Sequence, residues 1–169
     1  MVWDTAWNTN EWFVVGLTVF GFAAVALLPR RFARSTTIVF VAFGSYFGTL
    51  FDYLLAVPPL DFYDVNDRSE FEFTDSLTYL MYGPLGYLFV YLYDRLGAPG
   101  RWAPLYVFGW TVVALLLEAL YVNVGVFHYK NGYRLDYSGV VYLTLQLLAL
   151  ALYYKFRRPA ENGGNEEST

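Results

Sequence analysis

Two carboxylate side chains lie within long apolar stretches of the sequence, and they have the clearest capacity for chemistry. These residues are Asp52 and Glu118. A carboxyl group in such a setting can bind a cation, relay a proton or hydrogen-bond a neighbouring helix. Placing it in hydrocarbon costs about 2.5–3.5 kcal/mol on insertion scales, so such groups usually face the interior of a bundle. We therefore expect both acids to point inward.

The neighbours of these acids at helical spacing support that orientation. Gly44 and Gly48 precede Asp52 at intervals of four residues, a spacing that lets two helix backbones approach closely. Polar groups expected at a similar depth complete a predicted outward-facing pocket, whose members are Asp52, Tyr82, Glu118, Tyr121, His128, Tyr142 and Gln146. Two interpretations remain open: these groups hold helices together through hydrogen bonds, or they bind a cation, a proton or an amine-bearing solute.

Five stretches are long and apolar enough to position these groups as membrane-spanning helices, because about 20 helical residues cross the hydrocarbon core. They cover residues 12–28, 36–57, 76–93, 105–127 and 138–156. The first is not expected to be a cleaved signal peptide, because no basic region precedes it and arginines follow it. The sequence thus predicts an all-α integral membrane protein, a five-transmembrane-helix bundle within one domain over residues 1–158.

Lysine and arginine predict the orientation of this bundle, since they concentrate in cytoplasmic loops. With the N-terminus outside, eight of the eleven lie in inner segments. These eight are Arg30, Arg31, Arg34, Arg95, Arg101, Lys155, Arg157 and Arg158. The C-terminus is then cytoplasmic, in a multi-pass protein of the cell membrane. The polar tail, residues 159–169, is expected to be disordered.

The connections on the outer side hold the remaining candidates for ion binding. Residues 61–75 are rich in aspartate and glutamate. Because the EF-hand spacing is absent, we expect a solvated acidic loop, and calcium binding is the alternative. His128 is the only histidine and is expected at the outer end of the fourth span, hydrogen-bonding a loop or responding to pH. A lone histidine does not make a zinc site, so no metal site is predicted. Asn131-Gly132 predicts a tight turn.

A pattern made of Glu118, residues 125–133, Ser138 and residues 154–155 resembles that of an uncharacterised family of small, five-span integral membrane proteins of endospore-forming bacteria, and the likeness covers most of the chain. That family shows an intramembrane Glu, then Gly-x-Phe-x-Tyr-x-Asn-Gly-Trp, a Ser and a closing basic patch. The matching residues here are Glu118, Gly125-Val126-Phe127-His128-Tyr129-Lys130-Asn131-Gly132-Tyr133, Ser138 and Tyr154-Lys155, with Tyr133 in place of the family's Trp. Asp52 and a third span centred on Pro84 also fit its layout. The resemblance implies the five-span topology and no mechanism.

No motif in the sequence indicates a reaction. P-loop, dinucleotide, HExxH and GxSxG patterns are absent from the sequence, and there are no cysteines. We expect no cofactor and no catalytic residue, and predict a non-catalytic scaffold or accessory membrane subunit. The alternatives are a small binding or permeation protein with an acidic pocket, and a membrane enzyme acting on lipid or envelope substrates. The predicted partners are the lipid bilayer and a membrane protein or second copy, and not nucleic acid, because a basic face is lacking.

Overall fold

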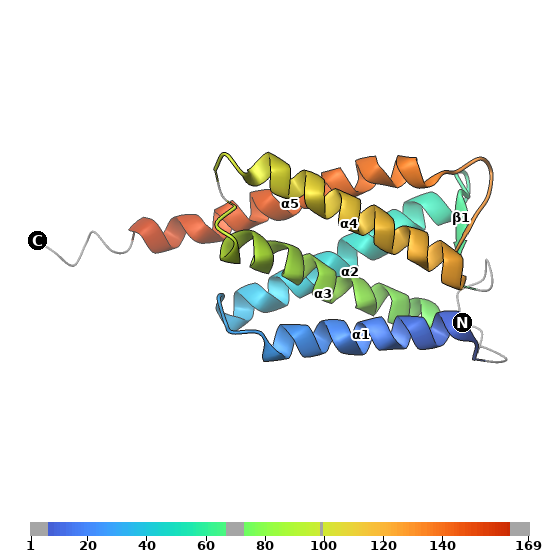
Figure 1. Ribbon diagram of the computed structural model, residues 1–169, viewed down its shortest axis with the longest axis horizontal. Helices are drawn as coiled ribbons and strands as arrows, with labels where there is room; N and C mark the ends of the chain where they lie inside the picture. The colour runs from blue at the N-terminus through green and yellow to red at the C-terminus, as the bar shows by residue number, and fades with distance from the viewer. Residues whose placement is uncertain (1–6, 67–72, 99, 163–169) are drawn as a thin grey trace, which may run out of the picture.

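The computed structural model describes residues 7–66, 73–98 and 100–162, with side chains up to Arg157. Its helices run back and forth along the long axis of the molecule, and a small sheet lies at one end (Figure 1). In chain order the elements are α1 (Thr9–Leu27), α2 (Arg34–Ala56), β1 (Tyr63–Val65), α3 (Phe73–Arg95), α4 (Ala103–Val124), β2 (Phe127–Tyr129) and α5 (Leu135–Asn162). The prediction of an all-helical bundle is confirmed, and the two short strands are additional.

The helix termini follow local chemistry and correct several predicted boundaries. A capping box of Asn8 and Glu11 starts α1, which satisfies backbone N–H groups at the helix start. Gly125, at φ 84°, ends α4, so the predicted fourth span to residue 127 is wrong at its end. The fifth helix starts earlier than the predicted 138 and continues to Asn162, so residues 159–162 are helical rather than disordered. Residues 163–169 lie outside the described part.

Helix α3 lies at the centre of the bundle and packs most closely against α2 and α1. The small-residue stripe of α2 allows this approach, because a Cβ added to Gly44 would lie 2.4 Å from the carbonyl oxygen of Tyr82. Gly21 of α1 leaves room for Pro84 in the same way. The predicted small-residue packing stripes are thus confirmed.

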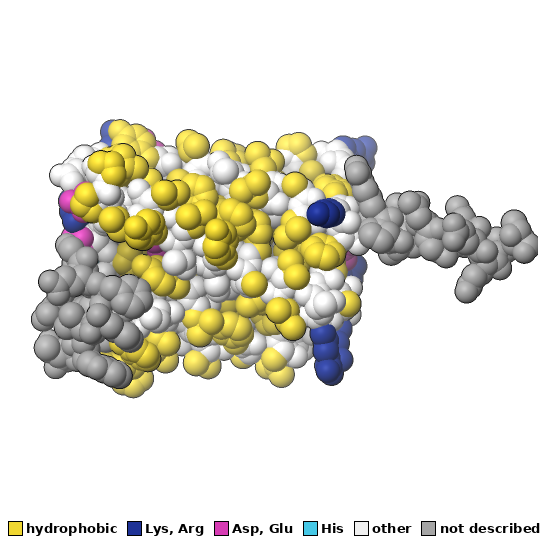
Figure 2. Space-filling view, turned by 180° about the vertical axis from the view of Figure 1, so that it is seen from behind, with side chains coloured by type: hydrophobic (Ala, Val, Ile, Leu, Met, Phe, Trp, Pro, Cys, Tyr) yellow, Lys and Arg dark blue, Asp and Glu magenta, His cyan; other side chains and the backbone are white. Residues whose placement is uncertain are grey.

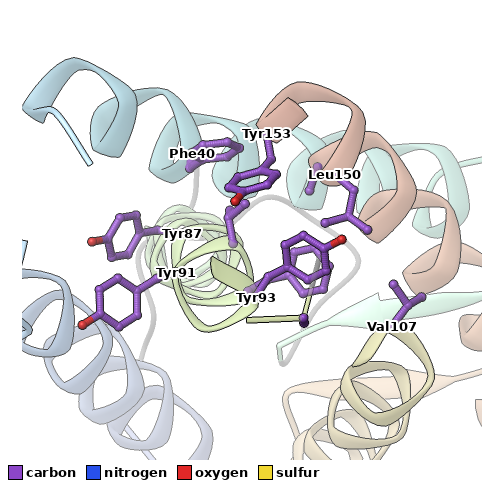
Figure 3. Close-up of a cluster of buried hydrophobic side chains, with 11 residues drawn as sticks. Phe40, Tyr87, Tyr91, Tyr93, Val107, Leu150 and Tyr153 are labelled. Carbon is purple, nitrogen blue, oxygen red and sulfur yellow. The ribbon is translucent and has the colours of Figure 1, made fainter. Parts of the chain in front are cut away.

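A hydrophobic cluster surrounds the C-terminal half of α3. Figure 3 shows Tyr87 and Tyr91 extending from one side of this helix and Tyr93 from the other, with Phe40 and Tyr153 above them. All five aromatic rings are at most 3% exposed. This cluster fixes α3 relative to its neighbours at the end of the bundle opposite the sheet.

The two strands form an antiparallel pair in which Tyr63 lies opposite Tyr129 and Val65 opposite Phe127. The predicted tight turn follows β2, where Asn131 and Gly132 both have positive φ values of 51° and 79°. The pair joins the α2–α3 connection to the α4–α5 connection across the end of the bundle (Figure 1).

The acidic connection between α2 and α3 is more ordered than a solvated loop in its described part. Lys130 forms ion pairs with Asp61 at 2.8 Å and with Asp64 at 2.7 Å. Asp75 is buried and accepts a hydrogen bond from Asn66 Nδ2 at 2.7 Å. The prediction of a solvated loop is therefore wrong for these residues, while residues 67–72 lie outside the described part. The described residues include no cluster of three potential metal-ligating acids, histidines or cysteines.

Four described helices are long and apolar enough to cross a membrane: α1, α2, α4 and residues Leu135–Arg157 of α5. They indicate a helical membrane protein. Helix α3 is not among them, although it has 23 residues, as α2 does. Hydrophobic side chains cover the middle of the face in Figure 2, and most of the visible Lys and Arg side chains lie at the end opposite the sheet. We call these the sheet end and the basic end.

Candidate functional site

A cavity of about 230 Å³ lies between α2, α3, α4 and α5. It exceeds the roughly 150 Å³ of an apolar cavity that binds benzene. Its walls are mainly apolar, with aromatic rings from Phe43, Phe47, Phe51, Phe89 and Trp110. Among the described residues that line it, none is a lysine, arginine or histidine. The cavity thus suits an apolar molecule of moderate size.

Asp52 brings the first carboxyl group to this cavity from the last turns of α2. Its side chain is buried, at 6% exposure. Oδ1 accepts a hydrogen bond from the Tyr63 hydroxyl at 2.8 Å, and Oδ2 accepts one from the Tyr82 hydroxyl at 2.7 Å. The donors come from β1 and α3, so this carboxyl group joins three elements.

Glu118 brings the second carboxyl group from α4 and is 3% exposed. Its Oε1 accepts hydrogen bonds from the Tyr129 hydroxyl at 2.5 Å and the Ser138 hydroxyl at 2.6 Å. Its Oε2 accepts one from the Tyr142 hydroxyl at 2.6 Å. The Tyr133 hydroxyl lies 2.9 Å from Ser138 Oγ and extends this network toward the turn after β2.

Both carboxyl groups therefore interact with neutral hydroxyl donors. Each of the four carboxyl oxygens of Asp52 and Glu118 lies within hydrogen-bond distance of a hydroxyl group, so all four have a partner. No side-chain cation among the described cavity residues balances their charge. The arrangement can bind a positively charged group that enters the cavity, because a cation in a low-dielectric site is attracted strongly to a carboxylate.

The cavity brings together five of the seven predicted pocket residues: Asp52, Tyr82, Glu118, Tyr142 and Gln146. Gln146 Oε1 also lies 3.3 Å from the hydroxyl of Thr111, which donates to it. The helical spacing that pointed to these residues thus identified the correct faces of α2, α4 and α5.

Two predicted pocket residues lie elsewhere. Tyr121 is buried beside the cavity, in the same cluster as Tyr63 and Phe127, but it does not line the cavity, and its hydroxyl contacts Met81 Sδ at 3.7 Å. His128 is an exposed residue of β2 opposite Asp64, and not the end of a helix. Their inclusion in the pocket was wrong.

Three hydroxyl donors of the site were not among the predicted pocket residues: Tyr63, Tyr129 and Ser138. Tyr63 enters from the connection between α2 and α3. The position of this connection depends on strand pairing, for which three-residue strands leave almost no sequence signal. Tyr129 and Ser138 stood out only as members of the short motif on which the expected family resemblance was based. Side chains from the sheet and its turn, including Tyr63 and Phe127, line the cavity at the sheet end.

No family model matches the chain, and no curated protein or solved structure matches it.

Proposed function

We propose that this chain is a five-span protein of the cell membrane that binds a small, largely apolar solute bearing an ammonium group. The observation that carries the proposal is the pair of carboxyl groups, Asp52 and Glu118, on the wall of an aromatic cavity that lacks a cation among its described lining residues. An apolar body would occupy the aromatic part, and the ammonium would approach the acids.

The location of α3 supports five crossings. It has the length of a membrane span, about 34 Å for 23 residues, and lies among the four apolar helices. Its tyrosines and its Gly83-Pro84 pair make it less apolar, but a helix surrounded by other helices does not need the apolar surface of a helix that faces lipid.

The charge distribution supports a cytoplasmic C-terminus. The described lysines and arginines of the basic end are all exposed: Arg30, Arg31, Arg34, Arg95, Arg101, Lys155 and Arg157. Because the chain has no cysteine, single cysteines can report the topology. With a membrane-impermeant maleimide on intact cells, Gly132→Cys should react, while Ser35→Cys and Gly97→Cys should react only after permeabilisation. Reaction of Gly97→Cys in intact cells would exclude five crossings with this orientation.

Recognition of an ammonium group would use both charge and aromatic rings. A hydrogen bond to a charged group contributes about 1.5–3 kcal/mol. A cation over an aromatic face adds about 0.5–2 kcal/mol, depending on desolvation. Phe47, Phe51 and Tyr82 line the cavity together with Asp52, so both contributions are available. A neutral analogue would keep only the apolar contacts.

The binding test compares 2-phenylethylammonium with the neutral 2-phenylethanol on the purified full chain in lipid nanodiscs. We expect the amine to bind more tightly than the alcohol. Asp52→Asn and Glu118→Gln should each weaken amine binding by roughly tenfold to hundredfold, the equivalent of one charged hydrogen bond, and leave alcohol binding nearly unchanged. Asn123→Asp, which adds a carboxyl group at an exposed position of α4, is the matched control. Equal affinity of the wild-type protein for amine and alcohol would refute the proposal.

A non-catalytic scaffold is the second candidate, and the hydrogen bonds of the acids favour it. Asp52 holds β1 and Glu118 holds β2 through tyrosine hydroxyls, so the two acids tie the sheet to the helices. In this case neither amine nor alcohol binds with useful affinity, and the acids affect stability alone. The nanodisc titration therefore separates the two functions.

A further inference from the structure

A second hollow lies on the side of the bundle between α2 and α5. It is an apolar groove lined by Phe43, Phe47, Leu148, Ala151, Leu152 and Lys155. The groove reaches toward the basic end, because Lys155, one of its lining residues, belongs to that end. Lys155 is its single charged residue among those described.

The groove and the cavity share a wall. Phe43 and Phe47 line both of them, and their rings lie 4.6 Å apart at an interplanar angle of 42°. Both side chains are half-buried. Phe43 and Phe47 therefore border both spaces, which lie next to each other along α2.

The charged residues of the two neighbouring spaces have opposite signs. Asp52 lies nine residues beyond Phe43, roughly 13.5 Å along the helix axis, and Glu118 lines the same cavity. Lys155 lies on the groove. A molecule with one cationic end and a long apolar tail is therefore oriented by attraction at the acids and repulsion at Lys155.

We propose that the ligand is a single-chain alkylammonium amphiphile. Its ammonium group lies at Asp52 and Glu118, and its alkyl tail passes Phe43 and Phe47 into the groove between α2 and α5. This inference rests on the proposed function and adds the ligand class and its route: the molecule enters sideways from the lipid. Its head lies toward the sheet end and its tail toward the middle of the membrane, as in a lipid of the leaflet at the sheet end.

The experiment fills the groove without touching the cavity. Ala151 lines only the groove, so Ala151→Trp blocks the tail and leaves the ammonium site intact. Ala42→Trp, at an exposed alanine of α2 that lines neither space, is the matched control. Binding of radiolabelled dodecylammonium and of 2-phenylethylammonium is measured on protein nanodiscs, with empty nanodiscs subtracted. Leu148→Trp replaces Ala151→Trp if that variant does not fold.

We expect Ala151→Trp to weaken dodecylammonium binding by about tenfold or more, the effect of excluding two buried methylene groups. Binding of the compact 2-phenylethylammonium should stay within about twofold, and Ala42→Trp should change neither amine. Unchanged dodecylammonium binding to Ala151→Trp, or equal weakening of both amines, would overturn the tail placement and leave the proposed function intact. Absence of 2-phenylethylammonium binding to the wild-type protein would overturn the proposed function itself.

Discussion

Replacement of Glu118 by leucine and by glutamine should have very different effects on stability. The carboxyl group accepts hydrogen bonds from Tyr129, Ser138 and Tyr142. Leucine accepts none of them. Glutamine keeps one carbonyl oxygen for Tyr129 and Ser138, and its amide group can donate to the oxygen of Tyr142. We therefore expect Glu118→Leu to destabilise the protein and Glu118→Gln to be nearly neutral.

The size of the difference follows from the burial of the three donors. A buried hydroxyl left without an acceptor costs about 1–3 kcal/mol. For Ser138, which is 5% exposed, the cost of the lost acceptor is the full range of about 1–3 kcal/mol. For the half-buried Tyr129 and Tyr142 it is about 1 kcal/mol each. The sum is about 3–5 kcal/mol, and removal of a buried carboxyl group offsets part of it. A net loss of about 2–4 kcal/mol remains for leucine, against less than about 1 kcal/mol for glutamine.

Reversible unfolding in mixed micelles, with SDS as denaturant, measures both free energies. A double-mutant cycle with Tyr142→Phe separates lost hydrogen bonds from poor packing of leucine. Once Glu118 is leucine, the Tyr142 hydroxyl has lost its acceptor, so Tyr142→Phe should cost less than it does in the wild-type protein. Equal losses for Glu118→Gln and Glu118→Leu, or additive effects in the cycle, would refute the assignment of the stability to these hydrogen bonds.

Three further predictions concern packing and charge, each measured as a free energy of unfolding. Gly44→Ala should lose about 1–3 kcal/mol, because its Cβ would meet the Tyr82 carbonyl oxygen, whereas Gly16→Ala, with open space around it, should be neutral or slightly stabilising. Hydrogen bonds to two aspartates raise the pKa of Lys130. The stabilisation by Lys130 is therefore present at neutral pH and is lost as pH rises through that raised pKa. The free energies of unfolding of the wild-type and Lys130→Gln proteins should converge in strongly alkaline solution. Asp94→Asn should lose about 1 kcal/mol, less at high salt, because it weakens contacts to an arginine and a tyrosine.

Local spacing predicted the parts of the site that lie on helices, because four-residue intervals determine which face of a helix a side chain occupies. Asp52, Tyr142 and Gln146 reached the cavity for this reason. Tyr121 did not, although it follows Glu118 by three residues. Its side chain lies instead in the buried cluster that contains Met81, whose sulfur its hydroxyl contacts.

Strand pairing lay beyond prediction, because it joins segments that are distant in the sequence. Tyr63 and Tyr129 are opposite one another in the sheet, and each donates to a different acid. Neither three-residue strand has a run of alternating residues long enough to stand out in the sequence. Gly125 was the visible signal that α4 ends before His128, because glycine supplies the left-handed conformation of a helix cap.

The central position of α3 explains why this helix is more buried than α2 and yet less apolar. Eleven residues of α3 are buried, against two of α2, yet α3 is the helix that does not qualify as an apolar span. Apolar composition identifies helices that contact lipid, whereas a helix enclosed by others can hold tyrosines, threonines and aspartates that find partners inside. Tyr82 depends on this position, because its hydroxyl donates to Asp52 from the middle of α3. A polar side chain that makes α3 less apolar than its neighbours therefore helps to hold Asp52 in place.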